Sequence, residues 1–268
     1  MSGPEETGIP NVVEFRNVTK QFGDLTIIRE VTFAVKDLPD KGEFIAILGP
    51  SGCGKSTVLR LIAGLPPHHP ATSGTVLVGG KPVECPGSDR SMVFQDYTSF
   101  DNRTVLQNIA FGLECAGMPG SEREDRARLW LGKVGLRSGD ANKYPHELSG
   151  GMRQRVAIAR TLILNPRIIL MDEPFGALDP ATRLNMQDLL VGLWREQQAT
   201  VLFVTHSIEE AVYLGDRVYI FSNAPGTIIK EIALPSPERP ARVMQREPEF
   251  TEAVFQIRDI VEKLEVEK

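Results

Sequence analysis

The sequence predicts an α/β fold with a largely parallel sheet, and three observations support this expectation. Segments with strand and helix patterns alternate through the second half of the chain. Phe44–Leu48 is a continuous apolar run that leads into glycines, as expected of a strand buried on both faces. Residues 105–164 have a helical pattern only, which indicates an insertion carried on the sheet.

The N-terminal elements are predicted to be strands. Short segments rich in β-forming residues lie at Val12–Phe15, Thr32–Val35 and Thr75–Val78. We expect them to form an antiparallel β subdomain beside the parallel sheet. Lys36–Gly42 has the character of a lengthened hairpin loop, and Leu59–Ala63 is the apolar part of a predicted helix.

The helical insertion is expected to form a subdomain over about residues 96–164. Its predicted helices, separated by Gly, Pro and Ser clusters, are Val105–Gly117, Glu122–Val134 and Gly151–Leu164. Beyond it we predict strands at Ile168–Met171, Thr200–Val204 and Arg217–Phe221, with helices at Ala181–Gln197 and Ile208–Leu214 between them. Since parallel strands need crossover connections, this alternation favours a parallel sheet.

The tail, residues 235–268, is predicted to be separate from the domain of residues 1–234. Pro235, Pro237 and Pro240 are expected to interrupt any regular element. Glu249–Lys268 should be a terminal helix, because apolar residues recur there at helical spacing: Phe250, Val254, Ile257, Ile260, Val261 and Leu264. The preferred interpretation is that this face docks on its own domain; contact with another subunit is the alternative.

Composition excludes several classes of protein. The net charge of −5, with both signs mixed, gives no basic footprint, so nucleic acid is not expected as a partner. No run of 18 apolar residues is present, and Met1–Gly8 lacks the layout of a signal peptide. The three cysteines form no paired framework, which suits a reducing cytosol. His68 and His69, among prolines, are expected in a solvated loop rather than at a metal.

A phosphate-binding loop follows the strand Phe44–Leu48. The run Gly49, Pro50, Ser51, Gly52, Cys53, Gly54, Lys55, Ser56 and Thr57 matches the Walker A pattern and predicts a P-loop NTPase core of the RecA-like type. Glycines let successive backbone N–H groups face phosphate oxygens, and the helix that begins near Lys55 adds its positive end. Lys55 would neutralise the β- and γ-phosphates of ATP, and Ser56 would bind Mg²⁺. Cys53 is interpreted as a small filler rather than a redox switch.

A second apolar strand ends in two carboxylates, Asp172 and Glu173. A strand next to the phosphate-loop strand would place Asp172 near the magnesium ion. Glu173, past the strand end, could act as general base on the water that attacks the γ-phosphate. An apolar run before Asp-Glu is usually structural when it stands alone. When a phosphate loop is also present, the two carboxylates are better explained as the magnesium ligand and the general base.

The run Leu148-Ser149-Gly150-Gly151-Met152 identifies the family among P-loop proteins. Alone it would be a helix N-cap and a turn. It resembles the signature Leu-Ser-Gly-Gly-Gln of ABC ATPases, and the Met152 variant resembles importers of nitrate, sulfonates and taurine. Further matches follow in family order: Gln95 of the Q-loop, Gly176–Asp179 of the D-loop, the switch histidine His206, and Phe22 where an aromatic stacks on adenine.

The resemblance implies a site shared between two copies of the chain, arranged head to tail. Ser149, Gly150 and Gly151 would contact a nucleotide bound mainly by the partner, and Asp179 would join them. His206 would hold the γ-phosphate and position the attacking water with Glu173. Gln95 would contact the magnesium ion and report nucleotide state to a membrane subunit.

The resemblance also implies the wider system. It predicts an ATP hydrolase on the cytoplasmic face of the inner membrane, partnered by transmembrane permease subunits and a substrate-binding protein, that energises import of a nitrate-, sulfonate- or taurine-type solute. One departure is Asp96–Thr104, a polar stretch where that group has apolar residues, in the segment that receives a permease helix. An exporter or lipid-transport ATPase is the main alternative; a soluble ABC ATPase acting on DNA or ribosomes is the third.

Overall fold

The computed structural model describes residues 10–38, 41–96 and 99–266, and within these ranges the strands form two sheets. The antiparallel sheet has the order β2-β1-β4-β5, made of β1 (Asn11–Phe22), β2 (Leu25–Lys36), β4 (Ser73–Val78) and β5 (Lys81–Pro82). The larger sheet has the order β10-β9-β3-β8-β7-β6. Its members are β3 (Phe44–Leu48), β6 (Arg90–Val93), β7 (Ile168–Asp172), β8 (Thr200–Thr205), β9 (Arg217–Phe221) and β10 (Ile228–Ala233).

The larger sheet is parallel from β9 to β6, and only β10 joins it in the antiparallel sense. Every residue of β3, β7 and β8 is buried, which is why these strands are apolar without alternation. Along β3, Ile45 and Ile47 pack in the cluster formed with α1 (Lys55–Ala63) and the antiparallel sheet. Phe44 and Leu48 pack in the other cluster, which includes side chains of α5 (Pro180–Gln197) and α6 (Ile208–Leu214). The expected α/β core with an antiparallel β sheet is confirmed.

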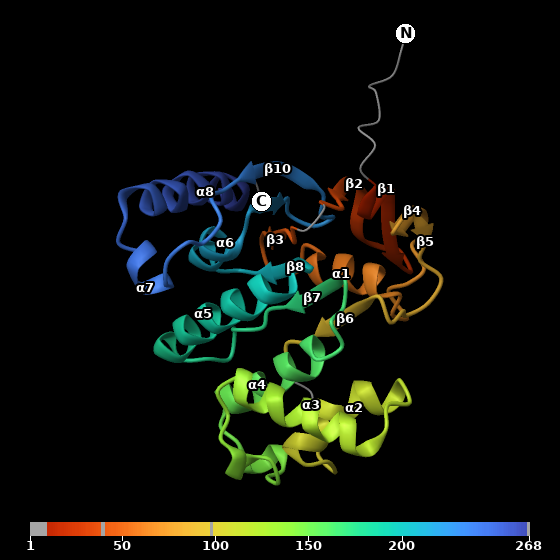
Figure 1. The fold of residues 1–268 in the computed structure, drawn as a ribbon. Coiled ribbons are helices and arrows are strands. Elements are labelled where there is room, and N and C mark those ends of the chain that lie inside the picture. The colour runs from red at the N-terminus through yellow and green to blue at the C-terminus, as the bar shows by residue number, and fades with distance from the viewer. Residues whose placement is uncertain (1–9, 39–40, 97–98, 267–268) are drawn as a thin grey trace.

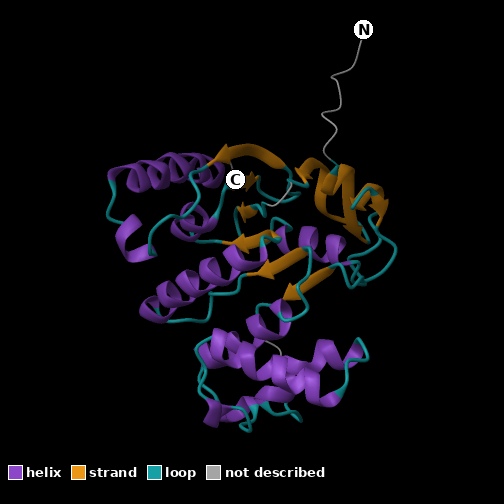
Figure 2. Ribbon diagram, viewed as in Figure 1, coloured by secondary structure: helices purple, strands orange, loops and turns teal. Residues whose placement is uncertain are grey.

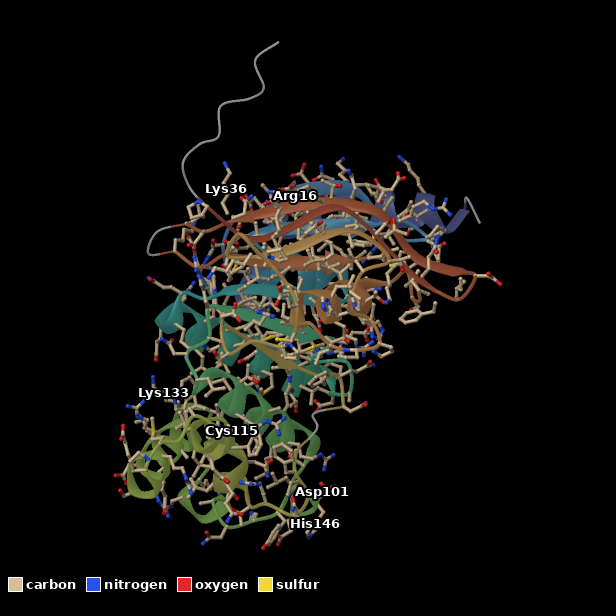
Figure 3. All side chains as sticks on the ribbon, turned by 90° about the vertical axis from the view of Figure 1, so that its right-hand side faces the viewer. Arg16, Lys36, Asp101, Cys115, Lys133 and His146 are labelled. Atoms are coloured by element: carbon tan, nitrogen blue, oxygen red, sulfur yellow. The ribbon has the colours of Figure 1, made fainter. Side chains whose placement is uncertain are left out.

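The inserted helices form a group of their own. Figure 1 shows α2 (Val105–Cys115), α3 (Gly120–Lys133) and α4 (Gly150–Leu162) below the larger sheet, and Figure 2 shows that this part of the chain is helical. Thr104 starts α2 through a reciprocal hydrogen-bonded cap with Gln107. In Figure 3, Lys133, Cys115 and His146 lie at this end of the molecule, far from Arg16 and Lys36 at the other.

The tail contains more regular structure than predicted. Residues 234–240, which contain Pro235, Pro237 and Pro240, lie in no helix or strand, so the expectation that these prolines interrupt regular structure is confirmed. A short helix that was not predicted, α7 (Ala241–Met244), begins directly after Pro240. Proline suits the start of a helix, where its missing N–H loses no hydrogen bond. The terminal helix is α8 (Pro248–Val266), and Phe250, Val254 and Ile257 are buried against the main core. This contact agrees with docking on its own domain.

Several bounds differ from those predicted. β1 and β2 are each 12 residues long, because irregular pairings let the hairpin continue beyond the alternating segments. β2 extends to Lys36, the first residue of the predicted loop, and residues 39–40 of that loop lie outside the described ranges. Also outside them are the segment Met1–Gly8, residues 97–98 of the polar stretch after Gln95, and the last two residues of the tail.

Candidate functional site

The phosphate loop connects β3 to α1 and is closely packed from behind. Gly54, the residue before α1, has φ 96°, and a Cβ placed there would lie 2.5 Å from Cγ2 of Ile28. A Cβ on Gly49 would lie 2.9 Å from Cβ of Phe221. Glycine is therefore favoured at Gly54 for backbone conformation and for space, and at Gly49 for space alone. The first turn of α1 has no side-chain cap, so its N–H groups remain available to an anion.

Lys55 lies across this loop. Its side chain is buried, with 5% of the residue exposed, and Nζ donates hydrogen bonds to the carbonyl oxygens of Gly49 at 2.7 Å and Pro50 at 2.9 Å. These carbonyls hold the ammonium group at the loop, where a phosphate oxygen could also reach it.

The side chain of Cys53 is fully buried behind the loop, and this burial raises the pKa of its thiol, which agrees with a filler role.

Asp172 is held at the end of β7 by two groups from α1. Ser56 Oγ donates a hydrogen bond of 2.7 Å to Oδ1 of Asp172, and Arg60 Nη2 lies 3.5 Å from Oδ2. Asp172 is only 2% exposed, and this burial raises the pKa of its carboxyl group. A hydroxyl and a carboxylate oxygen so close together are the donor types that Mg²⁺ prefers, so Ser56 and Asp172 fit a magnesium site.

The route by which Asp172 reaches Ser56 differs from the prediction. β8 lies between β3 and β7, so the strand that ends in Asp172 is not next to the phosphate-loop strand. Ser56 instead crosses from α1, which packs over this face of the sheet. Arg60 was missed, although it follows Ser56 by four residues on the same helix, a spacing that places both side chains on one face.

Glu173 and His206 form the second pair of the site. β7 and β8 are adjacent and parallel. Glu173 directly follows β7 and His206 directly follows β8, so the two residues leave the sheet side by side. Oε2 of Glu173 lies 3.3 Å from Nδ1 of His206. The backbone N–H of Glu173 donates to the carbonyl of Val204 at 3.0 Å, and Glu173 has the left-handed φ of 45°. A glutamate rarely adopts this conformation, and such strain is typical of functional sites.

Gln95 approaches from the neighbouring strand. It is exposed and lies two residues beyond Val93, which pairs with Met171 in the parallel register of β6 and β7. Three strands thus carry Gln95, Glu173 and His206 to the same edge of the sheet, at their carboxyl ends. That edge is where open α/β sheets bind ligands.

Comparison with known proteins agrees with this geometry. The family described as "ABC transporter" matches residues 31–176. The chain belongs to the ABC transporter family. It is the ATP-binding subunit type, and it is an ATP hydrolase.

Individual proteins and solved structures similar to this chain agree with the family assignment. The chain is 46% identical to a nitrate import ATP-binding protein, NrtD, of Synechocystis, over 85% of this chain and 87% of that protein. It is also 46% identical to a taurine import ATP-binding protein, TauB, of Rhizobium johnstonii, over 85% and 87%. Among solved structures, a dimeric post-hydrolysis state of an ATP-binding cassette bound to ADP and Pi is 34% identical. It covers 84% of this chain and 99% of that one, with a TM-score of 0.71.

The signature residues of this ATPase begin α4, which Figure 1 shows with the inserted helices, whereas the phosphate loop precedes α1 in the upper part of the molecule. Ser149 caps α4, its Oγ accepting a hydrogen bond of 3.3 Å from the N–H of Met152. A Cβ on Gly151 would lie 3.0 Å from Cγ2 of Thr182, so this end of α4 packs on the start of α5. Asp179 caps α5 through the N–H of Thr182 at 3.0 Å. The fold therefore brings the signature and Asp179 together; Gly150 has open space beside it.

Phe22 lies at the end of β1 with 37% of its surface exposed. His68 meets the ring edge to face at a centroid distance of 5.3 Å, and Nζ of Lys20 lies 4.9 Å from its centre. Burial lowers the pKa of His68, and the charges of Arg60 and Lys20 lower it further. His68 and His69 are both partly buried, and His69 Nε2 lies 3.1 Å from the carbonyl oxygen of Glu84. The sequence predicted a solvated loop here, whereas in the structure both histidines are partly packed.

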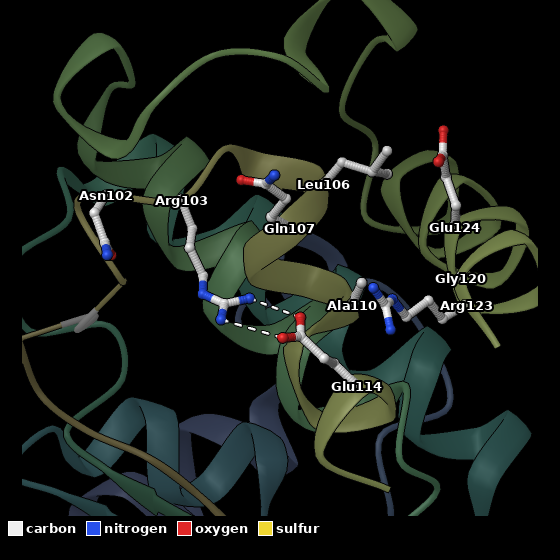
Figure 4. Close-up of a pocket in the computed structure, with 9 residues that line it drawn as sticks. All are labelled: Asn102, Arg103, Leu106, Gln107, Ala110, Glu114, Gly120, Arg123 and Glu124. Atoms are coloured by element: carbon white, nitrogen blue, oxygen red, sulfur yellow. Dashed lines mark hydrogen bonds and ion pairs between the residues drawn. The ribbon is translucent and has the colours of Figure 1, made fainter. Parts of the chain in front are cut away.

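Two cavities border the inserted helices. The larger, of about 800 Å³, is lined by aromatic and aliphatic side chains, among them Phe94, Phe100, Phe111 and Leu164, and also by Arg160 and several serine and threonine residues. The rings of Phe100 and Phe111 are 4.4 Å apart, so the polar stretch after Gln95 contributes an aromatic side chain. The other cavity, of about 590 Å³, lies beside α2 and contains the ion pair of Arg103 with Glu114 at 2.7 Å (Figure 4).

Among the described helices, none is long and apolar enough to cross a membrane.

Proposed function

We propose that this ATPase energises the import of a small anionic or organic nitrogen or sulfur solute, of the nitrate, sulfonate or taurine type. Hydrolysis is supported by one observation above all, the two pairs Ser56–Asp172 and Glu173–His206 at the edge that carries the phosphate loop. Import and the solute class are supported by relatives at 46% identity whose names state nitrate and taurine import.

The proposed roles follow from the contacts of each residue. Residues Gly49 to Thr57 surround the phosphates, and Lys55 exchanges its carbonyl contacts for phosphate oxygens. Ser56 and Asp172, with Gln95, would hold Mg²⁺, which when bound neutralises charge on the phosphates. Phe22 offers its exposed ring to the adenine.

Glu173 acts as the general base in this proposal. Its carboxylate accepts a proton from water as the water oxygen bonds to the γ-phosphorus, and the bond from that phosphorus to the ADP oxygen breaks. His206, whose Nδ1 lies 3.3 Å from Oε2 of Glu173, would help to position the same water and the γ-phosphate. Because the two side chains extend from adjacent strands, their separation is set by the sheet.

The site requires a second copy of the chain. Ser149, Gly150, Gly151 and Asp179 are exposed or partly exposed at one end of α4 and α5. We infer that they cover the nucleotide held by the phosphate loop of a partner arranged head to tail. The dimeric architecture of the similar cassette bound to ADP and Pi supports this arrangement.

Permease subunits are the proposed membrane partners, which would place the ATPase on the cytoplasmic face of the inner membrane. The apolar cavity next to Gln95, lined by Phe94, Phe100 and Phe111, suits a permease helix. Its position beside Gln95 would connect nucleotide state to the membrane subunit. A substrate-binding protein completes the proposed importer.

The decisive experiment is reconstitution with a permease and a substrate-binding protein found among the neighbouring genes. Proteoliposomes with ATP on the side of this subunit should accumulate labelled nitrate, taurine or an alkanesulfonate from the other side. Vesicles that carry Glu173→Gln provide the matched control. ATP-driven movement of solute away from the ATPase side would establish an exporter instead. Recovery of ribosomes or DNA with the purified chain, and of no membrane partner, would reject transport altogether.

A further inference from the structure

Glu210 is a buried carboxylate to which the proposed hydrolysis assigns no role. It lies on α6, four residues after His206, and is 6% exposed. Burial raises the pKa of its carboxyl group. A buried carboxylate is unfavourable unless its oxygens are paired, so its partners indicate why the fold retains it.

One oxygen of Glu210 fixes the residues that flank His206. Oε2 accepts a hydrogen bond of 2.6 Å from Oγ1 of Thr205. The same Oγ1 accepts a hydrogen bond of 3.0 Å from the backbone N–H of Ser207. The residues immediately before and after His206 are therefore tied to one carboxylate through one hydroxyl.

The other oxygen of Glu210 faces Arg183, a side chain of α5 that also contacts the loop between β7 and α5. Oε1 lies 3.6 Å from Nε of Arg183, on the first turn of α5. Arg183 in turn donates from Nη2 to the carbonyl oxygen of Leu178 at 3.1 Å. Leu178 directly precedes Asp179, which caps α5. A continuous chain of polar contacts thus runs from the backbone beside Asp179 to the backbone beside His206.

We propose that Glu210 is a positioning residue that sets His206 and the Leu178–Asp179 segment in one mutual arrangement. The inference rests on the proposed roles of His206 and Asp179. Because Asp179 lies at the surface offered to the second copy, docking of that copy would act on His206 through Arg183, Glu210 and Thr205. The phosphate loop and Lys55 take no part in this link, so initial ATP binding should not depend on it.

The test compares Glu210→Ala with the parent chain in two measurements, the dissociation constant for ATP and single-turnover phosphate release. We expect hydrolysis to slow roughly tenfold, the equivalent of about 1.4 kcal/mol in the barrier, with the dissociation constant unchanged. Glu210→Gln should lose less, because its amide oxygen can still accept from Thr205. Glu249→Gln is the control, since Glu249 is exposed on α8 and makes the same chemical change away from His206. Thr205→Val keeps the side-chain shape, removes the hydroxyl and replaces Glu210→Ala if that variant does not fold.

A double-variant measurement separates positioning from a general structural role. On a His206→Ala background, Glu210→Ala should cause no further loss of phosphate release, because its effect passes through His206. A further loss, an unchanged rate in the single Glu210 variant, or a weakened ATP affinity would each overturn the proposal. If His206→Ala itself hydrolyses ATP like the parent, the fault lies with the proposed role of His206 and not with the link to Glu210.

Discussion

The two glycine-rich helix starts of this ATPase differ in what surrounds them. At α1, Gly54 provides no side-chain cap, and Lys55, Ser56 and Asp172 gather charge and hydrogen-bonding groups around the free N–H groups. At α4, Ser149 already caps Met152, a Cβ on Gly150 would meet no atom within 4 Å, and the Arg153 guanidinium is held by the carbonyl oxygen of Leu148. We propose that the first start holds a phosphate of the nucleotide bound by its own chain, and that the second contacts a nucleotide bound by the other copy.

The largest expected effect tests the phosphate-loop side of this comparison. In Glu173→Gln the amide cannot accept a proton, so hydrolysis should fall by roughly 10²–10⁴-fold while ATP binding persists. Phosphate release and nucleotide affinity would be measured on the same preparation, with Glu249→Gln as an exposed control on α8. Parent-like turnover in Glu173→Gln would remove Glu173 from the role of base.

Lys55→Ala should weaken ATP binding itself. The ammonium group is the buried cation of the loop, and loss of a hydrogen bond from a charged group is worth about 1.5–3 kcal/mol, or roughly 10–100-fold in affinity. Equilibrium binding of a fluorescent ATP analogue would measure this change. Lys81→Ala, on the exposed β5, should leave the affinity unaltered. Near-normal binding in Lys55→Ala would contradict the assignment of the loop.

Ser149→Arg tests the signature side, and it should leave initial ATP binding intact. A bulky cation in place of the cap would obstruct the surface offered to the second copy. In a Glu173→Gln background, ATP should produce a dimer, whereas the double variant should remain monomeric by sedimentation velocity. If the double variant dimerises with ATP, or if Ser149→Arg alone loses monomer binding of ATP, the signature does not have this role.

Sequence patterns predicted local parts of the fold better than long-range ones. β3, β7 and β8 were predictable because strands buried on both faces are apolar throughout. β6 and β10 were missed, since a four-residue strand and a half-exposed edge carry little pattern. The strand order, with β8 between β3 and β7, depends on contacts between distant segments, and no local pattern contains it.

The candidate site shows the same division. Motifs in the sequence indicated Lys55, Asp172 and Glu173, because phosphate chemistry demands those groups at fixed spacing. No motif assigned a role to Glu210, which lies in a run that resembles the family, since two adjacent glutamates on a short helix have the pattern of a solvated face. Its burial follows from the packing of α6 in the fold, where the Glu210 carboxylate contacts Arg183 of α5 and Thr205 of β8. Only the folded chain reveals such a contact.

The smallest expected effects are changes in melting temperature. A substitution beside the phosphate loop should raise the melting temperature, and one at the signature should lower it. The raised pKa of Asp172 means that folding disfavours its charged form, so Asp172 destabilises the fold as pH rises through that pKa. Asp172→Asn should therefore raise the melting temperature of the nucleotide-free protein near pH 7, by roughly 2–4 °C for each kcal/mol. The gain should vanish as pH falls and the parent carboxyl group becomes protonated.

Ser149→Ala should instead lower the melting temperature at every pH, because it removes a helix cap worth about 1 kcal/mol and no titrating group. Melting curves of the parent and both variants between pH 4 and pH 8 would show the contrast. Equal shifts of one sign would mean that the two starts do not differ as proposed. The expected result would show that the phosphate-loop side keeps a charge at the expense of stability, whereas the signature side is stabilised by the residue it offers to its partner.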